Sequence, residues 1–184
     1  MGGEEAPEGA FDFLGTPEPL VCAGTLVHPQ VLVTAAHCEC GFTGVDVLLG
    51  TNNARDRRDA LDVVPVSDQR IVHPSYNSAT QNADIMLVKL SREARSTVPV
   101  ATIATNVPGA GSIVRAVGFG ALSEGGRGSD TLQVVSVPVV ASSTCSSDQY
   151  YGNLVNEVTM VCAGVEGRDS CQGERKMRTS SFEP

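Results

Sequence analysis

Three short stretches of this 184-residue sequence contain side chains that could transfer protons. The first is LVTAAHC, residues 32–38, in which His37 follows an apolar run and two alanines. Small neighbours at the end of a strand leave space around the ring, and an accessible imidazole is a common general base. A lone histidine is more often structural, so this stretch indicates catalysis only if His37 has a partner.

The second stretch, NADIMLVKL at residues 82–90, offers such a partner. Asp84 leads directly into an apolar run that is typical of a buried strand. Because an unpaired carboxylate is costly to bury, we expect Asp84 to accept a hydrogen bond, and a histidine N–H is a suitable donor. The third stretch, DSCQG at residues 169–173, contributes Asp169 and Gly173.

Short strands are the elements that must position these side chains. Turn residues separate short runs rich in valine, isoleucine and leucine, which is the pattern of a β-rich chain. The best helix candidate begins at Ser142 and ends at Tyr150, because serine and threonine are frequent at helix N-termini. The expected strands are residues 20–27, 31–35, 45–49, 61–66, 85–90, 113–119, 131–140 and 158–162.

The composition argues against several classes of function. Charged residues make up 18% of the chain and the formal net charge is −8, which does not suit binding to nucleic-acid phosphates. No apolar run approaches the ~18 residues of a membrane-spanning helix. Acidic side chains recur through the first residues of the chain, which is not the pattern of a secretory signal peptide.

The cysteines, at positions 22, 38, 40, 145, 162 and 171, have two interpretations. His37, Cys38 and Cys40 form a cluster of thiols and an imidazole, the donor types that bind zinc. However, zinc sites usually space their cysteines about two to four residues apart and add a second ligand pair. Disulfides spread along a β-rich chain are the alternative, and they indicate an oxidising compartment.

Together, the three stretches resemble the trypsin and chymotrypsin family of serine endopeptidases. Residues 32–38 resemble the sequence around the family's catalytic histidine, and Asp84 falls on the catalytic aspartate. VGFG at residues 117–120 resembles the family's Gly-Trp-Gly segment, and the opening GGEEAPEGAFDF resembles the start of a mature protease. The resemblance covers residues 2–173. It implies an all-β fold with two antiparallel Greek-key β-barrels of the chymotrypsin type, the second barrel incomplete.

The implied organisation has three parts. Residues 1–90 form an N-terminal β-barrel with the catalytic histidine and aspartate, and residues 112–184 form a partial C-terminal β-barrel with a divergent tail. Between them, residues 91–111 contain two prolines and little alternation, which favours a connector. By the resemblance, the chain stops before the second half of the C-terminal barrel and lacks the inserting residue of the mature N-terminus.

The resemblance also implies how the cysteines are used. It places them in an extracellular, secreted protein, although no signal peptide is present in this chain. The implied disulfides are Cys22–Cys38 and Cys145–Cys162, and the cysteines without an assigned partner are Cys40 and Cys171.

Two residues of the third stretch receive roles from the resemblance. Asp169 would lie at the floor of the specificity pocket, where a carboxylate selects Lys or Arg side chains by charge pairing. The backbone N–H of Gly173 would be one donor of the oxyanion hole. No metal ion and no cofactor is implied.

The family pattern breaks after Gly173. The family continues with Asp-Ser-Gly-Gly-Pro, whereas this chain continues with Glu174 and Arg175. Arg175 takes the place of the nucleophilic serine, and a guanidinium is always protonated and cannot attack a carbonyl. Ser180 and Ser181 lie on a short tail without the turn that presents a nucleophile to its base.

We therefore expect a homologue of trypsin-like endopeptidases that acts on, or binds, a polypeptide and that is inactive as this chain. The alternative is a non-enzymatic homologue that serves as a binding, decoy or inhibitor module. A structural or redox role for the unpaired cysteines is a third interpretation. The sequence gives no indication of the oligomeric state.

Overall fold

The computed structural model describes residues 3–17, 22–122 and 126–164, and the statements below concern these residues. They fall into two compact units, which are treated separately. The barrel unit comprises Ala6–Thr105 and Asp130–Leu132, and the sheet unit comprises Met1–Glu5, Asn106–Ser129 and Gln133–Pro184. In the described ranges, no helix has the length and apolar character needed to cross a membrane.

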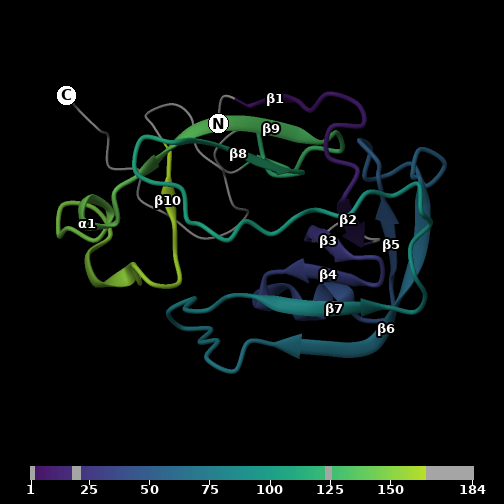
Figure 1. The fold of residues 1–184 in the computed structure, drawn as a ribbon, viewed down its shortest axis with the longest axis horizontal. Helices are drawn as coiled ribbons and strands as arrows, with labels where there is room; N and C mark the ends of the chain where they lie inside the picture. Colours follow the sequence, from purple (N-terminus) through teal and green to yellow (C-terminus); the bar gives the residue numbers. More distant parts are fainter. Residues whose placement is uncertain (1–2, 18–21, 123–125, 165–184) are drawn as a thin grey trace. The chain divides into compact units, whose positions relative to one another are not determined.

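The barrel unit is a closed β-barrel whose strands follow the order β2-β3-β4-β7-β6-β5 (Figure 1). Every pair of neighbours is antiparallel. Closure gives each strand two neighbours, so the barrel has no unpaired edge. The strands are β2 (Leu14–Pro17), β3 (Gly24–His28), β4 (Val31–Thr34), β5 (Asp46–Leu49), β6 (Asp62–Val72) and β7 (Met86–Leu90).

Alternating side chains of these strands fill the barrel interior. In β7, Met86, Val88 and Leu90 are 1%, 0% and 0% exposed, whereas the intervening Leu87 and Lys89 are exposed. This is the period of two that a strand with one buried face requires. The same core includes Leu26, Leu32, Phe42, Val47, Leu49 and Val64, all of them completely buried.

The sheet unit is built around β9 (Gln133–Val140). Along one side, β9 pairs with β8 (Ile113–Gly118), from Ile113 opposite Pro138 to Gly118 opposite Gln133. The short strands β1 (Glu4–Glu5) and β10 (Cys162–Ala163) also pair antiparallel with β9. In the described residues, β9 is the one strand that pairs with β8, and the β8 residue Ile113 is 67% exposed. Among the described residues, this sheet therefore has an unpaired edge at β8, whereas the strands of the barrel unit form a closed ring.

The helix expected at residues 142–150 is shorter in the structure. α1 covers Ser142–Cys145, and turns follow it up to the one-turn 3₁₀-helix η2 (Gly152–Leu154). The Ser147 hydroxyl favours the early end, because such a side chain offers an alternative to helical bonding. Ser147 Oγ donates to the carbonyl of Thr144 at 2.8 Å, and Ser146 Oγ donates to Glu157 at 2.7 Å.

These observations confirm the fold class expected from the sequence. The described chain is mostly β, with one closed antiparallel barrel and few helical residues. The second β unit is a partial barrel over the described residues.

Candidate active site

His37 lies three residues after the end of β4 and is the second residue of the 3₁₀-helix η1 (Ala36–Phe42). The end of the strand is fixed by Thr34, which is 7% exposed and donates its hydroxyl to the carbonyl of Ala23 at 2.7 Å. On the other side, Cys38 is 6% exposed and packs in the barrel core. His37 is therefore the exposed residue between two buried neighbours, and its ring is directed away from the core.

Asp84 is presented by a strained turn that leads into β7. Gln81 and Ala83 have φ values of 57° and 51°, in the left-handed region that side chains other than glycine rarely adopt. The N–H of Ile85 donates to the carbonyl of Ala83 at 2.8 Å, which closes a tight turn around Asp84. Strain of about 1–3 kcal/mol per residue persists where the surroundings impose it, and it is concentrated at functional sites.

Asp84 binds His37 through both of its carboxylate oxygens. Asp84 Oδ2 lies 2.6 Å from His37 Nδ1, and Oδ1 accepts the backbone N–H of His37 at 2.9 Å. The side chains of His37 and Asp84 are 42% and 20% exposed. The second bond fixes the backbone of His37, so Asp84 holds both the main chain and the imidazole ring of this residue.

This contact determines the tautomer of His37. An ionised carboxylate only accepts hydrogen bonds, so the hydrogen in this bond belongs to Nδ1. In the neutral ring the free lone pair is then on Nε2, on the side of the ring away from Asp84. An exposed imidazole in this state can withdraw a proton from a hydroxyl placed against Nε2, and Asp84 would stabilise the imidazolium that results.

Both disulfides implied by the sequence resemblance are present. Cys22 bonds to Cys38 next to His37, and Cys145 bonds to Cys162 in the sheet unit. Cys40 is a free, exposed cysteine. The second of the unassigned cysteines, at position 171, lies outside the described residues.

The zinc alternative has a counterpart in the structure, although with different members. Donor atoms of Cys22, His37 and Cys38 lie within 4.8 Å of one another. In the structure, the two sulfur atoms of this group are bonded to each other, and a metal-binding cysteine must be a thiolate. While that disulfide is intact, His37 is the one unmodified donor of the group.

The remaining predicted site residues lie outside the described ranges. The structure thus brings together His37 and Asp84 from positions 47 residues apart. The predicted site residues that lie outside the described residues are Asp169, Gly173, Arg175, Ser180 and Ser181.

Sequence reasoning did not find two features that hold the pair in place. One is the backbone N–H of His37, which every residue except proline carries and which leaves no signal in a sequence. The other is the left-handed conformation of Ala83. Alanine is not a residue type associated with that conformation, so its identity gives no warning either.

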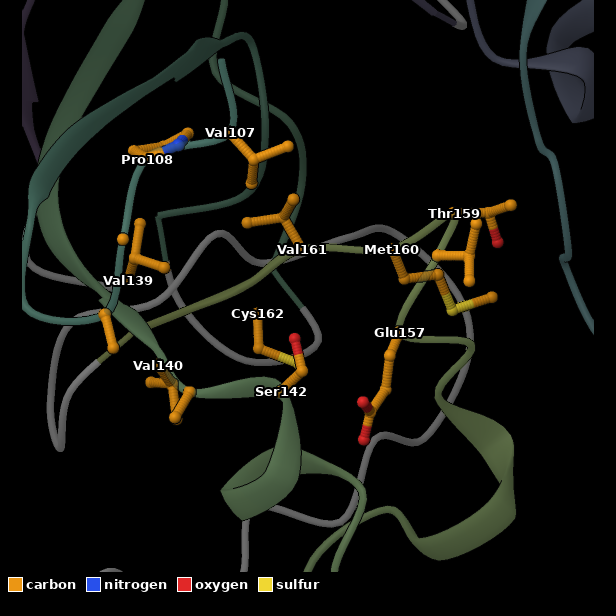
Figure 2. A pocket seen from close by; sticks show the side chains of 14 residues that line it. Val107, Pro108, Val139, Val140, Ser142, Glu157, Thr159, Met160, Val161 and Cys162 are labelled. Atoms are coloured by element: carbon orange, nitrogen blue, oxygen red, sulfur yellow. The ribbon is translucent and has the colours of Figure 1, made fainter.

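A pocket of about 420 Å³ is built entirely from the sheet unit (Figure 2). Val139 and Val140 from β9 and the chain from Glu157 to Cys162 line it. Glu157 is its acidic side chain, and its carboxylate accepts the Ser146 hydroxyl. His37 and Asp84 are not among the lining residues, so this pocket is not formed by the histidine–aspartate pair.

The sequence model described as Trypsin matches residues 1–174 of this chain. The chain belongs to the trypsin family. This confirms the family expected from the three sequence stretches. The match includes His37 and Asp84 and leaves out the last ten residues, 175–184.

Named relatives agree with this assignment. Brachyurin of Leptuca pugilator is 34% identical over 157 residues, which cover 83% of this chain and 67% of the relative. Trypsin I-P1 of Gallus gallus is 37% identical over 158 residues, covering 83% of this chain and 61% of the relative. Kallikrein-15 of Homo sapiens is 33% identical over 168 residues, covering 83% and 63%. This trypsin-family chain therefore spans about two thirds or less of the length of the curated relatives that it matches.

Proposed function

We propose that this chain carries the proton-accepting half of a serine endopeptidase site, with His37 as general base and Asp84 as the residue that orients it. The observation that carries the proposal is the contact of 2.6 Å between His37 Nδ1 and Asp84 Oδ2, with Nε2 left for a nucleophile. The proposed reaction of the intact site is hydrolysis of a peptide bond in a polypeptide. His37 would take the proton of a serine hydroxyl and return it to the leaving amine.

As this polypeptide, the chain is proposed to be inactive toward peptide bonds. The sequence after Gly173 has Glu174 and Arg175 where the family has an aspartate and the serine. Arginine has no lone pair for attack at any accessible pH. A general base without a hydroxyl nucleophile forms no acyl-enzyme with an amide substrate, so amide hydrolysis loses its covalent step.

A substrate preference and a compartment are proposed as well. A carboxylate at Asp169 would favour substrates with Lys or Arg before the scissile bond. The two disulfides, Cys22–Cys38 and Cys145–Cys162, favour an oxidising, extracellular compartment.

The direct test is turnover by the purified 184-residue chain. The chain is offered a fluorogenic peptide amide with Arg or Lys before the cleaved bond, and separately a reagent that labels activated serines. We expect no turnover and no labelling, because Arg175 stands where the family has its activated serine. Turnover that is lost in His37→Ala would show instead that another residue acts as the nucleophile.

A second candidate function is a non-enzymatic homologue that binds a protein partner. The presence of Arg175 at the place of the nucleophile favours it. The two candidates differ in what the gene encodes after the codon of Gly173. An alternative frame or exon for Asp-Ser-Gly-Gly-Pro would support the endopeptidase, and its absence from gene and transcripts would support the binding module.

A further inference from the structure

The three histidines of this chain present different ring nitrogens to solvent. All three are exposed residues in the described part of the chain. In His28, Nδ1 accepts the N–H of Gln30 at 3.3 Å, and in His73, Nδ1 accepts the N–H of Ser75 at 3.1 Å. A ring nitrogen that accepts a hydrogen bond carries no hydrogen, so these two neutral rings have their hydrogen on Nε2.

His37 has the opposite arrangement. Its Nδ1 donates to Asp84, so its Nε2 carries the free lone pair. In His28 and His73 the lone pair accepts a backbone N–H, and in His37 it lies on Nε2, the ring nitrogen that does not contact Asp84. His37 is thus the histidine of this chain whose neutral form is ready to act as a nucleophile.

We infer that His37 Nε2 is itself an acyl acceptor, and that the chain hydrolyses activated aryl esters without a serine. This activity goes beyond the proposed function, because it needs neither a hydroxyl nucleophile nor the residues after Gly173. The substrate class is an ester with a stable aryloxide leaving group, such as 4-nitrophenyl acetate.

The reaction has two balanced steps. In the first, the Nε2 lone pair attacks the ester carbonyl carbon, and the carbon–oxygen bond breaks so that the aryloxide leaves with its electron pair. The ring becomes an acyl-imidazolium whose positive charge lies beside the Asp84 carboxylate. In the second, water adds to the acyl carbon and loses a proton to solvent, and the acyl–Nε2 bond breaks with its electrons returning to nitrogen. One ester and one water give one carboxylic acid and one phenol.

The leaving group explains why esters react and peptides do not. An amine must be protonated before it leaves, which in this family requires the complete sequence of proton transfers. An aryloxide leaves as an anion and needs no proton from the enzyme. Asp84 is a positioning residue here, since it fixes the tautomer and balances the cation without touching the ester.

The kinetic test compares four forms of the 184-residue chain with 4-nitrophenyl acetate as the probe. These are the native chain, His37→Gln, Asp84→Asn and the matched control His73→Gln. We expect the rate above buffer to be lost in His37→Gln and unchanged in His73→Gln. Prior treatment with a serine-directed reagent should leave the native rate unchanged, and a loss of rate on that treatment would overturn the inference.

Asp84→Asn tests the tautomer directly. The Asn carbonyl oxygen can still accept the His37 N–H, but the Asn amide then donates to Nδ1 and moves the ring hydrogen to Nε2. We expect the ester rate to fall to that of His37→Gln. Nitrogen NMR should show the hydrogen of His37 on Nδ1 in the native chain and on Nε2 in the variant, while His28 and His73 keep theirs on Nε2.

Two results would overturn the inference: a hydrogen on Nε2 of His37 in the native chain, or full ester activity in Asp84→Asn. If a variant unfolds, the native chain still decides the question, because quenching during turnover and peptide mapping should place the acyl group on His37. An acyl group found elsewhere contradicts the inference. Failure of this inference is distinguishable from failure of the proposed function, because failure of the proposed function would appear as turnover of the peptide amide.

Discussion

At the scale of single residues, Asp62 is a buried carboxylate of the barrel unit with charged partners. Its side chain is 1% exposed and accepts two hydrogen bonds of 2.8 Å from Arg92. The backbone N–H groups of Val63 and Arg95 also donate to it, each at 2.9 Å. The hydrogen bonds from Arg92 are the main cause that lowers the pKa of Asp62 from 3.8 to about 2. The ionised form of Asp62 therefore stabilises the folded state.

We predict that Asp62→Asn lowers the free energy of unfolding at neutral pH by about 2 kcal/mol, the equivalent of this pKa shift. A depressed carboxylate pKa contributes stability above the unfolded pKa, near 4, and the contribution is lost as pH falls toward about 2. The difference between native chain and variant should therefore shrink from pH 5 to pH 2 in urea unfolding. A constant difference over this range would contradict the prediction.

Asp46 provides the matched control. It also pairs with an arginine, Arg57, at 2.7 Å, but the two side chains are 35% and 50% exposed. Exposed pairs contribute about 0–1 kcal/mol, so Asp46→Asn should cost less than Asp62→Asn and show a weaker pH dependence.

The carboxylates of Asp84 and Asp62 show what sequence can predict about a site. For Asp84, the cost of burying a carboxylate at the start of an apolar run predicted a partner, and the structure places His37 there. The same reasoning applies to Asp62, but arginines at 55, 57, 58, 92 and 95 are all available in the sequence. The antiparallel pairing of β6 with β7, which sets Val66 opposite Leu90, brings Arg92 to Asp62, so the chain fold had to be known before that partner could be identified.

At the scale of elements, β2 depends on the absence of a side chain at Gly15. A Cβ atom there would lie 2.7 Å from Val47 Cγ1 and 2.8 Å from Leu49 Cδ2. Both neighbours are completely buried, so neither can move aside freely. Gly15 lets β2 pack closely against β5 and complete the barrel.

We predict that Gly15→Ala destabilises the chain by about 1–3 kcal/mol, the usual cost of overpacking a core. The double variant Gly15→Ala/Val47→Ala should be less destabilised than the sum of its single variants, because the smaller side chain gives space to the new methyl group. Urea unfolding of the four forms measures this coupling. Simple additivity would show that the clash is not with Val47. Gly118→Ala, with nothing within 4 Å of its Cβ, serves as the uncrowded control.

Strands were predicted well where the residue types favour a strand and the structure pairs the same residues with a neighbouring strand. The expected strands at 31–35, 45–49 and 113–119 correspond closely to β4, β5 and β8. β2 was missed because its sequence, LGTP, contains glycine and proline and is stabilised by its barrel neighbours. The strand predicted at 61–66 was too short, because β6 continues through the polar segment Ser67–Arg70. In this segment the pairing of β6 with β7 shifts its register, between Val66 and Arg70.

At the scale of the whole molecule, the two units differ in how completely they bury their strands. The barrel unit has a closed set of strands and a core of completely buried side chains. In the sheet unit, most of β8 is half-buried or exposed, and the apolar side chains Val107, Val158 and Val161 are 75%, 91% and 58% exposed. Burial of apolar surface is the main source of stability, so the units should differ in local stability.

We predict that native-state hydrogen exchange will separate them. Amides of β4 and β7 should exchange only through global unfolding, whereas amides of β8 should exchange through local opening at a lower free energy. Exchange measured by NMR at increasing denaturant gives both values. Equal protection of β8 and β4 would indicate one cooperative unit instead.

The division of the molecule depends in part on contacts that a sequence does not show. The prolines of segment 91–111 indicated a connector, and the boundaries at 90 and 111 remain a prediction. Residues 130–132 belong with the barrel unit although they directly precede β9. Their bonds to Asn52 and Ala54 join positions far apart in sequence, and no local pattern announces such a contact.

His37, Asp84 and the Cys22–Cys38 bond all lie within one closed barrel. The described contacts of the histidine–aspartate pair therefore come from residues of the barrel unit. A change of the residue at the nucleophile position would not remove either contact, so an intact pair does not by itself show that a trypsin-family chain cleaves peptides.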